Sequence, residues 1–189
     1  MTNAAVQGLR VAILATDGVE RVELEQPRQA LDDAGATTVL LSLRAGEIQA
    51  RKNDLEPAGT FSVDGLVSEA SVDDYDALVL PGGTVNPDKL RIDSDAVAFV
   101  RDFATSGKLV AAICHGPWTL VEADVVRGRT LTSWPSVRTD LRNAGAEVVD
   151  SEVVVDQALV TSRKPDDLPA FCATVLEMLA RAPQATGSG

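Results

Sequence analysis

Four segments of strand length consist mostly of apolar residues and recur along the first two thirds of the chain. They lack the alternation of a half-buried strand, which is typical of strands buried on both faces of a parallel sheet. The segments are residues 9–15 (LRVAILA), 37–42 (TTVLLS), 76–80 (DALVL) and 109–113 (LVAAI). Shorter apolar runs predict late strands at residues 130–133, 148–149, 153–155 and 159–161.

Between these segments, apolar residues follow helical spacing, and proline or glycine marks several starts and stops. Residues 43–71 are irregular and have room for a small hairpin. We predict helices from about 19 to 35, from about 93 to 106, from Gly116 or Pro117 onward, from 135 to 145, and from Pro165 or Asp166 along an apolar stripe that includes Leu179.

The alternation of strands and helices predicts one doubly wound α/β domain over residues 1–189, with a mostly parallel central sheet. We expect a core over about residues 9–182 and a flexible tail at 183–189. In such sheets, functional side chains collect beyond the carboxyl ends of the strands. The segments in that position are residues 17–23, 81–83 and 114–116.

The acidic composition narrows the choice of partners. The 189 residues carry a formal net charge of −11, which disfavours binding to the phosphate backbone of DNA or RNA. No apolar run is long enough to cross a bilayer, and residues 1–8 lack the basic-then-apolar order of a signal peptide. We therefore expect a cytoplasmic protein that binds neither nucleic acid nor membrane.

The scarcity of cysteine and histidine excludes several kinds of site. The chain has two cysteines, Cys114 and Cys172, and one histidine, His115. They cannot form a disulfide framework or a zinc site with several imidazoles or four thiolates. A nucleophile paired with a remote histidine, as in papain-like and Ser-His-Asp hydrolases, is excluded too. The Gly82-Gly83 pair lacks the spacing of a dinucleotide or phosphate loop, so the sequence implies no cofactor and no metal.

Cys114 is the strongest candidate for a catalytic residue. It follows five apolar residues and precedes a Gly-Pro helix start, which is the strand–turn–helix setting of a nucleophile elbow. The start of the next helix would favour the thiolate, which is the reactive form of the side chain. Cys172, within the last amphipathic helix, is interpreted as a packing residue.

Three further features could complete a site around this thiol. The N–H of His115 follows the nucleophile, where an oxyanion donor would lie, and its imidazole could act as general acid or base; a packing role is the alternative. Gly83 could supply a second oxyanion donor, or its Pro-Gly-Gly turn could be structural. Glu20 and Glu23 lie one turn apart on one face of the predicted first helix. There a carboxyl could donate to the sulfur, although a solvated acidic face is the alternative.

Five segments together resemble the ThiJ/PfpI family, and within it the branch of PfpI intracellular proteases and general stress proteins. They are AAICHGPWTL, DALVLPGG, TDGVERVEL, GRTLTSWPS and NAGAEVVD. The resemblance covers about residues 9–180 and implies a flavodoxin-like sandwich. It also implies a homo-oligomer, either a dimer or a dimer-based hexamer, with the active site at the subunit boundary.

The resemblance further implies roles for individual residues. Cys114 matches the family nucleophile and His115 its adjacent histidine. Glu23 matches the carboxyl that touches the thiol, with Glu20 beside it. Gly83 matches the oxyanion glycine of the Pro-Gly-Gly turn.

Three positions depart from the family pattern. In the peptidase branch a glutamate of the neighbouring subunit orients the histidine, and Asp88 takes that position here with one methylene less. Trp134 replaces the tyrosine common in the peptidase-type proteins, which removes a hydroxyl and adds bulk. Asn53 stands where the stress-protein branch often has a histidine. Because Asp88 is short and Trp134 is bulky, we rank peptidase activity lower.

Three functions remain compatible with this pattern. The first is a stress-response enzyme in which the Cys114 thiolate attacks reactive dicarbonyls such as methylglyoxal, or their adducts, as in a glyoxalase or deglycase. The alternatives are an intracellular cysteine peptidase and a non-enzymatic peroxide sensor oxidised at Cys114. A glutamine amidotransferase shares the elbow but needs a histidine downstream of His115, which the chain lacks.

Overall fold

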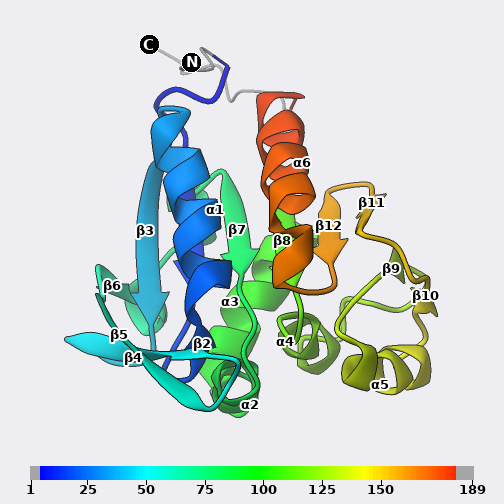
Figure 1. Ribbon diagram of the computed structural model, residues 1–189. Helices are drawn as coiled ribbons and strands as arrows, with labels where there is room; N and C mark the ends of the chain where they lie inside the picture. The colour runs from blue at the N-terminus through cyan, green and yellow to red at the C-terminus, as the bar shows by residue number, and fades with distance from the viewer. Residues whose placement is uncertain (1–4, 182–189) are drawn as a thin grey trace.

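The computed structural model describes residues 5–181, and its centre is a seven-stranded sheet (Figure 1). The strand order is β11-β12-β8-β7-β1-β3-β6, and every neighbouring pair is parallel except β11 with β12. The four long apolar segments all form strands of this sheet, so the predicted parallel sheet is confirmed. The strands are β1 (Arg10–Leu14), β3 (Thr37–Ser42), β6 (Gly65–Leu66), β7 (Ala77–Leu80), β8 (Leu109–Ile113), β11 (Val153–Asp156) and β12 (Leu159–Ser162).

Helices cover both faces of the sheet, as a doubly wound sandwich requires. They are α1 (Arg21–Asp33), α2 (Val85–Leu90), α3 (Ser94–Thr105), α4 (Pro117–Glu122), α5 (Arg138–Asn143) and α6 (Leu168–Arg181). α1 and α6 lie side by side in front of the sheet in Figure 1. Alternate residues of β1 divide the core: Val11 and Ile13 pack with α1 and α6, whereas Ala12 and Leu14 pack with α3 and α4. Among residues 5–181, no helix is long and apolar enough to span a membrane.

Shorter elements lie outside the central sheet. The hairpin expected within residues 43–71 is present as β4 and β5. The predicted tail at residues 183–189 lies outside the described part of the chain. The remaining elements are β2 (Val19–Glu20), β4 (Glu47–Lys52), β5 (Glu56–Ser62), β9 (Thr130–Leu131), β10 (Glu147–Val148) and the 3-10 turns η1 (Val67–Glu69), η2 (Val72–Asp74), η3 (Pro135–Val137) and η4 (Pro165–Asp167).

The start of the first helix differs from the prediction. Gly18, with a φ of +87°, turns the chain so that Val19 and Glu20 form β2 and pair with β4. The helix begins only at Arg21, and Glu20 precedes it in extended conformation. The prediction that Glu20 and Glu23 share one helix face was therefore wrong. The sequence analysis also missed α2, because its six residues are too few to show a helical period.

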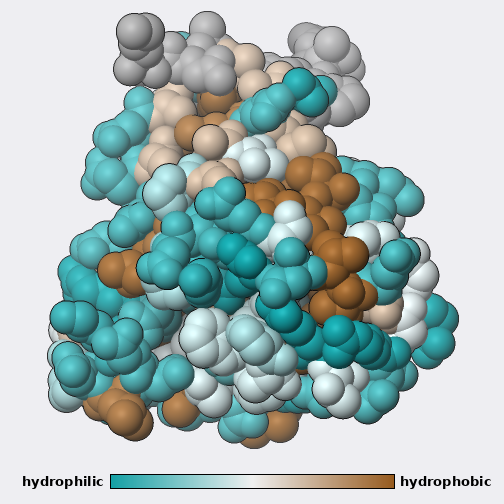
Figure 2. All heavy atoms as spheres, turned by 45° about the vertical axis from the view of Figure 1, so that its right-hand side comes forward, coloured by the Kyte–Doolittle hydropathy of each residue, from teal (hydrophilic) through white to brown (hydrophobic). Residues whose placement is uncertain are grey.

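An apolar band covers the side of the molecule formed by β11 and α6 (Figure 2). Val155 on the edge strand is 47% exposed, while Val153, Leu176 and Met178 are half-buried against the core. The band is thus the outer wall of the core cluster between α6 and the sheet, and partial exposure of this kind is common in folded proteins.

Replacing Phe171 tests the packing of α6. Its ring is fully buried between α6 and the sheet, so Phe171→Ala is expected to lower the free energy of unfolding by about 3–5 kcal/mol. Cys172→Ala, at the half-buried neighbouring position, is the control and is expected to cost about 1 kcal/mol or less. Urea denaturation measures both values, and equal losses would contradict this packing.

Candidate functional site

Three loops meet beyond the carboxyl ends of β1, β7 and β8, at the lower edge of the sheet in Figure 1. They contain the segments that the sequence analysis singled out. A small cavity of about 80 Å³ lies between them. Its lining includes five of the predicted site residues: Glu20, Glu23, Gly83, Cys114 and His115.

Cys114 occupies the turn between β8 and α4 in a strained backbone conformation. Its φ of +61° lies in the left-handed region, which residues other than glycine rarely adopt. Its N–H donates to the carbonyl of Ser162 (3.1 Å), and its own carbonyl accepts from the N–H of Trp134 (2.9 Å). The N–H of Gly116 closes the turn on the carbonyl of Ile113 (2.8 Å). Backbone strain held by such bonds is typical of a nucleophile elbow.

Glu23 is fully buried in the first turn of α1 and contacts the thiol. Its Oε2 accepts the N–H of Gly82 at 2.9 Å, and its carboxyl hydrogen-bonds with Cys114. Oε1 is buried, and within residues 5–181 no hydrogen-bond donor satisfies it. A Cβ at position 82 would lie 2.5 Å from Glu23 Oε2 and 2.8 Å from Cys114 Cβ. Glycine at this position is therefore what allows the carboxyl and the thiol to meet.

Burial raises the pKa of both acids of this pair, which favours their protonated forms. Burial, above all, raises the pKa of Glu23 to about 8. Burial also raises the pKa of the Cys114 thiol, and negative charge on Glu23 would raise it further. The N–H groups of His115 and Gly83 lie close enough to the sulfur to lower its pKa, but their effect is smaller. Burial and the neighbouring Glu23 carboxyl therefore oppose the helix start, which the sequence analysis expected to favour the thiolate.

His115 contacts the neighbouring thiol directly. Its Nδ1 is 3.3 Å from Cys114 Sγ, and its Nε2 is 3.3 Å from the hydroxyl oxygen of Ser136. Its ring stacks on Trp134 (centroids 5.8 Å apart) and meets the edge of Trp118 (5.3 Å). Burial lowers the pKa of the imidazole, so its neutral form, which can accept a proton, prevails at neutral pH.

The tip of the β4–β5 hairpin covers the cavity. Asn53 and Asp54 line it, both with positive φ. The Asp54 carboxylate accepts from the N–H (2.7 Å) and the hydroxyl (2.9 Å) of Thr84, and its own N–H donates to Glu20 Oε2 (3.4 Å). Burial raises the pKa of Glu20. Glu20 therefore holds the hairpin tip, whereas Glu23 touches the thiol.

Asp88 is the one predicted site residue that does not line the cavity. It is exposed on α2, and within the chain Ser136 contacts Nε2 of the imidazole instead. The suggested role of Asp88 toward a neighbouring subunit stays a prediction. The sequence analysis missed Ser136 and Asp54, because one lies in a 3-10 turn and the other in a hairpin turn, where no periodicity indicates which way a side chain points.

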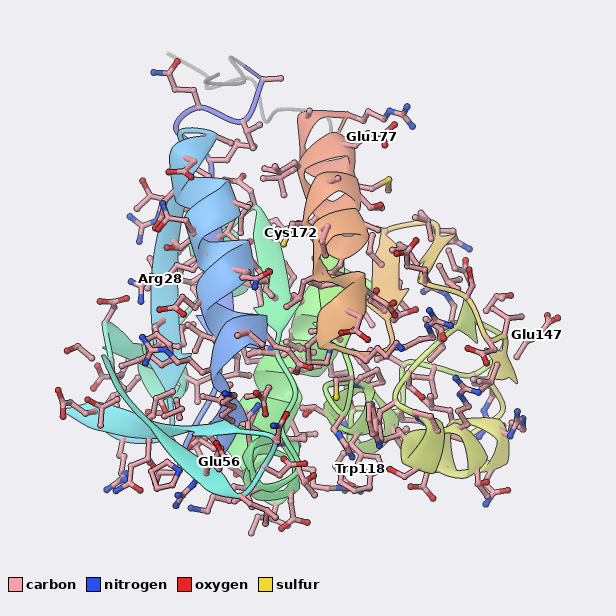
Figure 3. All side chains as sticks on the ribbon, in the orientation of Figure 1. Arg28, Glu56, Trp118, Glu147, Cys172 and Glu177 are labelled. Carbon is pink, nitrogen blue, oxygen red and sulfur yellow. The ribbon has the colours of Figure 1, made fainter. Side chains whose placement is uncertain are left out.

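The second cysteine lies away from this site. Figure 3 shows Cys172 along α6, whereas Trp118 on α4 lies near the lower edge of the sheet. Cys172 packs against the core, and burial raises its pKa to about 11. A thiol of this kind is protonated at neutral pH, and no side chain among residues 5–181 forms a hydrogen bond or ion pair that would activate it.

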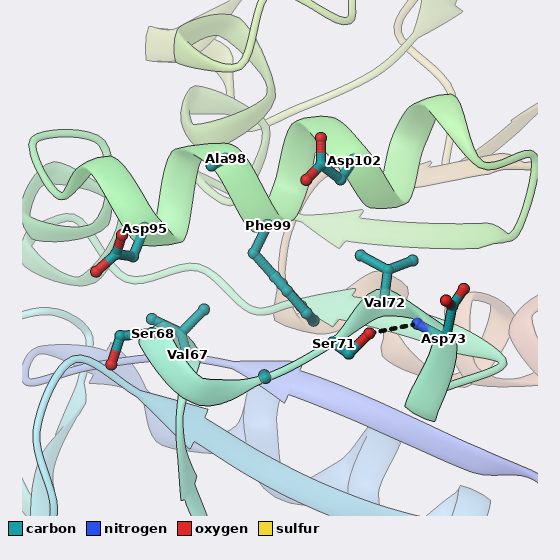
Figure 4. A pocket seen from close by; sticks show the side chains of 10 residues that line it. Val67, Ser68, Ser71, Val72, Asp73, Asp95, Ala98, Phe99 and Asp102 are labelled. Carbon is teal, nitrogen blue, oxygen red and sulfur yellow. Dashed lines mark hydrogen bonds between the residues drawn. The ribbon is translucent and has the colours of Figure 1, made fainter.

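A larger cavity, of about 390 Å³, lies between α3 and the segment that carries η1 and η2 (Figure 4). Asp73, Asp95 and Asp102 line it together with apolar residues such as Phe99. The residues that line this cavity include no cysteine and no histidine, and none of them belongs to a strained turn. Across residues 5–181, no group of three or more His, Cys, Asp or Glu side chains is placed to hold a metal ion.

Fold and site together define a class of protein: an α/β sandwich with a buried cysteine on a strained strand–helix turn, next to a carboxyl, an imidazole and two backbone N–H groups. The sequence model of the DJ-1/PfpI family matches residues 9–178. The chain belongs to the DJ-1/PfpI family, which confirms the resemblance to ThiJ/PfpI proteins.

Three known proteins illustrate the likeness. "Protein/nucleic acid deglycase 2" of Escherichia coli (strain K12) is 44% identical over 172 residues, which are 90% of this chain and 97% of the relative. "Putative cysteine protease YraA" of Bacillus subtilis (strain 168) is 40% identical over 170 residues, which are 90% and 98% of the two chains. These names describe different reactions, so the relatives suggest an enzyme without selecting one reaction.

The third is a crystal structure from Anabaena variabilis (ATCC 29413), a two-domain protein with DJ-1/ThiJ/PfpI-like and ferritin-like domains. It matches with a TM-score of 0.84 at 39% identity. The match covers 90% of this chain and 48% of that one, so this chain spans about half of the two-domain protein.

Glu23→Gln tests the protonation of the buried carboxyl. Between about pH 4.5 and 8, folded Glu23 holds a proton that the unfolded chain has released, so its contribution to stability falls as the pH rises. We expect the free energy of unfolding of the wild type to decline in this range by up to about 1.4 kcal/mol per pH unit relative to Glu23→Gln. Urea denaturation at several pH values measures the slope. Glu25→Gln, exposed on α1, is the control, and parallel curves for wild type and Glu23→Gln would contradict the raised pKa.

Proposed function

We propose that this protein is a cysteine-dependent enzyme that acts on small reactive dicarbonyls such as methylglyoxal, or on their early adducts. The observation that carries the proposal is the meeting of the Cys114 thiol, the Glu23 carboxyl, the His115 imidazole and the N–H of Gly83 in one small cavity. The name of the deglycase relative supports chemistry of this kind.

In the first step the Cys114 sulfur bonds to the aldehyde carbon, and negative charge develops on the aldehyde oxygen. Nδ1 of His115, 3.3 Å from the sulfur, takes the thiol proton. The N–H groups of Gly83 and His115 stabilise the charged oxygen, as in an oxyanion hole. Glu23, protonated below about pH 8, donates its proton to that oxygen, and a hemithioacetal results.

In the second step the hemithioacetal becomes a thioester. The Glu23 carboxylate removes the proton from the former aldehyde carbon and delivers it to the neighbouring ketone carbon. His115 takes the hydroxyl proton from the oxygen on the first of these carbons and gives a proton to the oxygen on the second. Water then attacks the thioester carbon and the carbon–sulfur bond breaks. The proton from water and the proton on His115 restore the carboxyl and the thiol. Methylglyoxal and water thus give lactic acid, with no oxidant or reductant.

A cysteine peptidase is the second candidate. The contact of 3.3 Å between Cys114 and His115 and the name of one relative support it. The size of the site favours the dicarbonyl reaction, because a cavity of about 80 Å³ is far below the roughly 300–1,000 Å³ of pockets for larger ligands. Trp134 also occupies space beside the cavity. Hydrolysis of a fluorogenic peptide that depends on Cys114 would favour the peptidase.

The first functional test is lactate formation from methylglyoxal without added thiol. We expect the wild type to form lactate and Cys114→Ala to form none above background, because the covalent bond to sulfur is lost. Cys172→Ala, which removes the remote thiol, is expected to keep the wild-type rate. Enzymatic assay of lactate is the measurement, since loss of methylglyoxal also reports reversible addition to any thiol. An active Cys114→Ala variant would contradict the proposal.

We also propose a homo-oligomer, a dimer or a dimer-based hexamer, with the site at the subunit boundary. Three exposed apolar side chains on the hairpin tip and around α2 support it: Leu55 (86% exposed), Val85 (44%) at the first residue of α2, and Ile92 (85%) two residues beyond its end. The bond between Asp54 and Thr84 brings the hairpin tip and α2 together. Apolar residues gathered in this way often mark a protein interface.

The double substitution of Leu55 and Ile92 by Asp tests this interface. Two charges among these exposed apolar side chains are expected to shift the sedimenting mass from oligomer to monomer. The reason is that the interface would bury each charge without a partner, which is costly in free energy. Sedimentation velocity measures the change, and Val155→Asp on β11 is the control for an exposed apolar residue elsewhere. A wild type that is already monomeric would refute the proposed oligomer.

A further inference from the structure

Asn86 is a fully buried polar residue with every side-chain hydrogen-bonding group in use. It lies in α2 with none of its surface exposed. Its Nδ2 donates to the carbonyls of Pro81 and Gly82, at 3.0 Å each. Its Oδ1 accepts the N–H of Thr16, directly beyond β1, at 2.8 Å. One side chain thus ties the Pro-Gly-Gly turn to the neighbouring strand end.

The two carbonyls that Asn86 holds belong to the peptide groups whose N–H groups face the site. The Pro81 carbonyl shares its peptide with the N–H of Gly82, which donates to Glu23 Oε2 at 2.9 Å. The Gly82 carbonyl shares its peptide with the N–H of Gly83, which approaches the Cys114 sulfur. In a trans peptide the C=O and N–H point in opposite directions, and no cis peptide occurs in residues 5–181. Holding the carbonyls on one side therefore directs both N–H groups to the other.

Two consecutive glycines do not keep such an orientation by themselves. Glycine has more accessible backbone conformations than any other residue, so the turn needs an outside constraint. The N–H of Glu20 also donates to the Gly82 carbonyl, at 3.3 Å, but the bonds from Asn86 are shorter and reach both carbonyls. Asparagine suits this place because its amide combines two donors with an acceptor.

We propose that Asn86 is a positioning residue that orients the peptide groups of the Pro-Gly-Gly turn, and through them sets the reactivity of Cys114. It touches neither the cavity nor the thiol and acts only through the two N–H groups. The inference depends on the geometry of the turn and not on the proposed reaction. The other ionisable groups around Glu23 and Cys114 are Glu20, Asp54 and His115, and Asn86 contacts none of them.

The test is the rate of alkylation of Cys114 by iodoacetamide as a function of pH. The measurement is made in the Cys172→Ala background, so that Cys114 is the thiol that iodoacetamide modifies. Asn86→Leu has a similar volume and removes all three hydrogen bonds. The turn can then rotate away, and the sulfur and Glu23 lose donors that favour their charged forms. We expect the midpoint of the alkylation profile to rise by about one pH unit, with a slower rate at neutral pH.

Two further variants separate orientation from a general loss of stability. Asn86→Asp keeps the acceptor for Thr16 but loses the donors to both carbonyls, and it is expected to raise the midpoint as well. Ser106→Ala removes a hydrogen-bonded hydroxyl at the end of α3, remote from the site, and is expected to leave the midpoint unchanged. A folded Asn86→Leu or Asn86→Asp variant with the wild-type profile would overturn the proposal.

A measurement on the unsubstituted chain gives an independent test. If Asn86 holds the turn, we expect the amide hydrogens of Gly82 and Gly83 to exchange with solvent deuterium slowly. Their exchange rates should match those of the amides in the neighbouring strand β7. Rapid exchange of both glycine amides would show that the turn is not held and would equally overturn the proposal. If lactate formation is also measured, Asn86→Leu is expected to lower kcat with little change in KM, by no more than the roughly 10²–10³-fold that follows the complete loss of an oxyanion donor. Failure of the lactate assay alone would refute the proposed reaction but not the role of Asn86.

Discussion

The contact between the Glu23 carboxyl and the Cys114 thiol is the constraint on which the site depends. It is possible only because position 82 has no side chain, since a Cβ there would overlap both groups. In the proposed reaction the same contact also governs the chemistry. Two buried acids in contact resist ionisation, so the carboxyl keeps a proton that it can deliver to a developing charge. The thiol in turn needs a nearby base when it reacts, and His115 is in contact with it.

The parallel sheet explains why these groups meet although they are far apart in sequence. β1, β7 and β8 are neighbours and run in the same direction, so the loops after them share one edge. The strands are buried on both faces by helices, and this packing sets where the edge lies. Backbone hydrogen bonds to Cys114 then maintain a conformation that an isolated peptide would avoid.

The cavity is acidic, and this restricts what can react there. Glu20, Glu23 and Asp54 line it, and no lysine or arginine is among its lining residues in the described part of the chain. In the proposed reaction a neutral carbonyl compound can approach without electrostatic cost, whereas an anionic one would be repelled by any carboxylate of this lining. The hairpin that brings Asp54 to the site also covers it, so charge and access are controlled by the same element.

The sequence by itself determined the parallel sheet, the elbow at Cys114, and the set of loops that carry Glu23, Gly83 and His115, because runs of apolar residues and turn residues are local signals. It could not determine that Glu20 leaves the helix, that burial raises the pKa of the thiol, or that Ser136 and Asn86 hydrogen-bond with the imidazole and the glycine turn. Those outcomes depend on which side chains face one another across separate elements and on how much water is excluded between them. Only the tertiary structure decides such contacts, since they join residues without any fixed spacing along the chain.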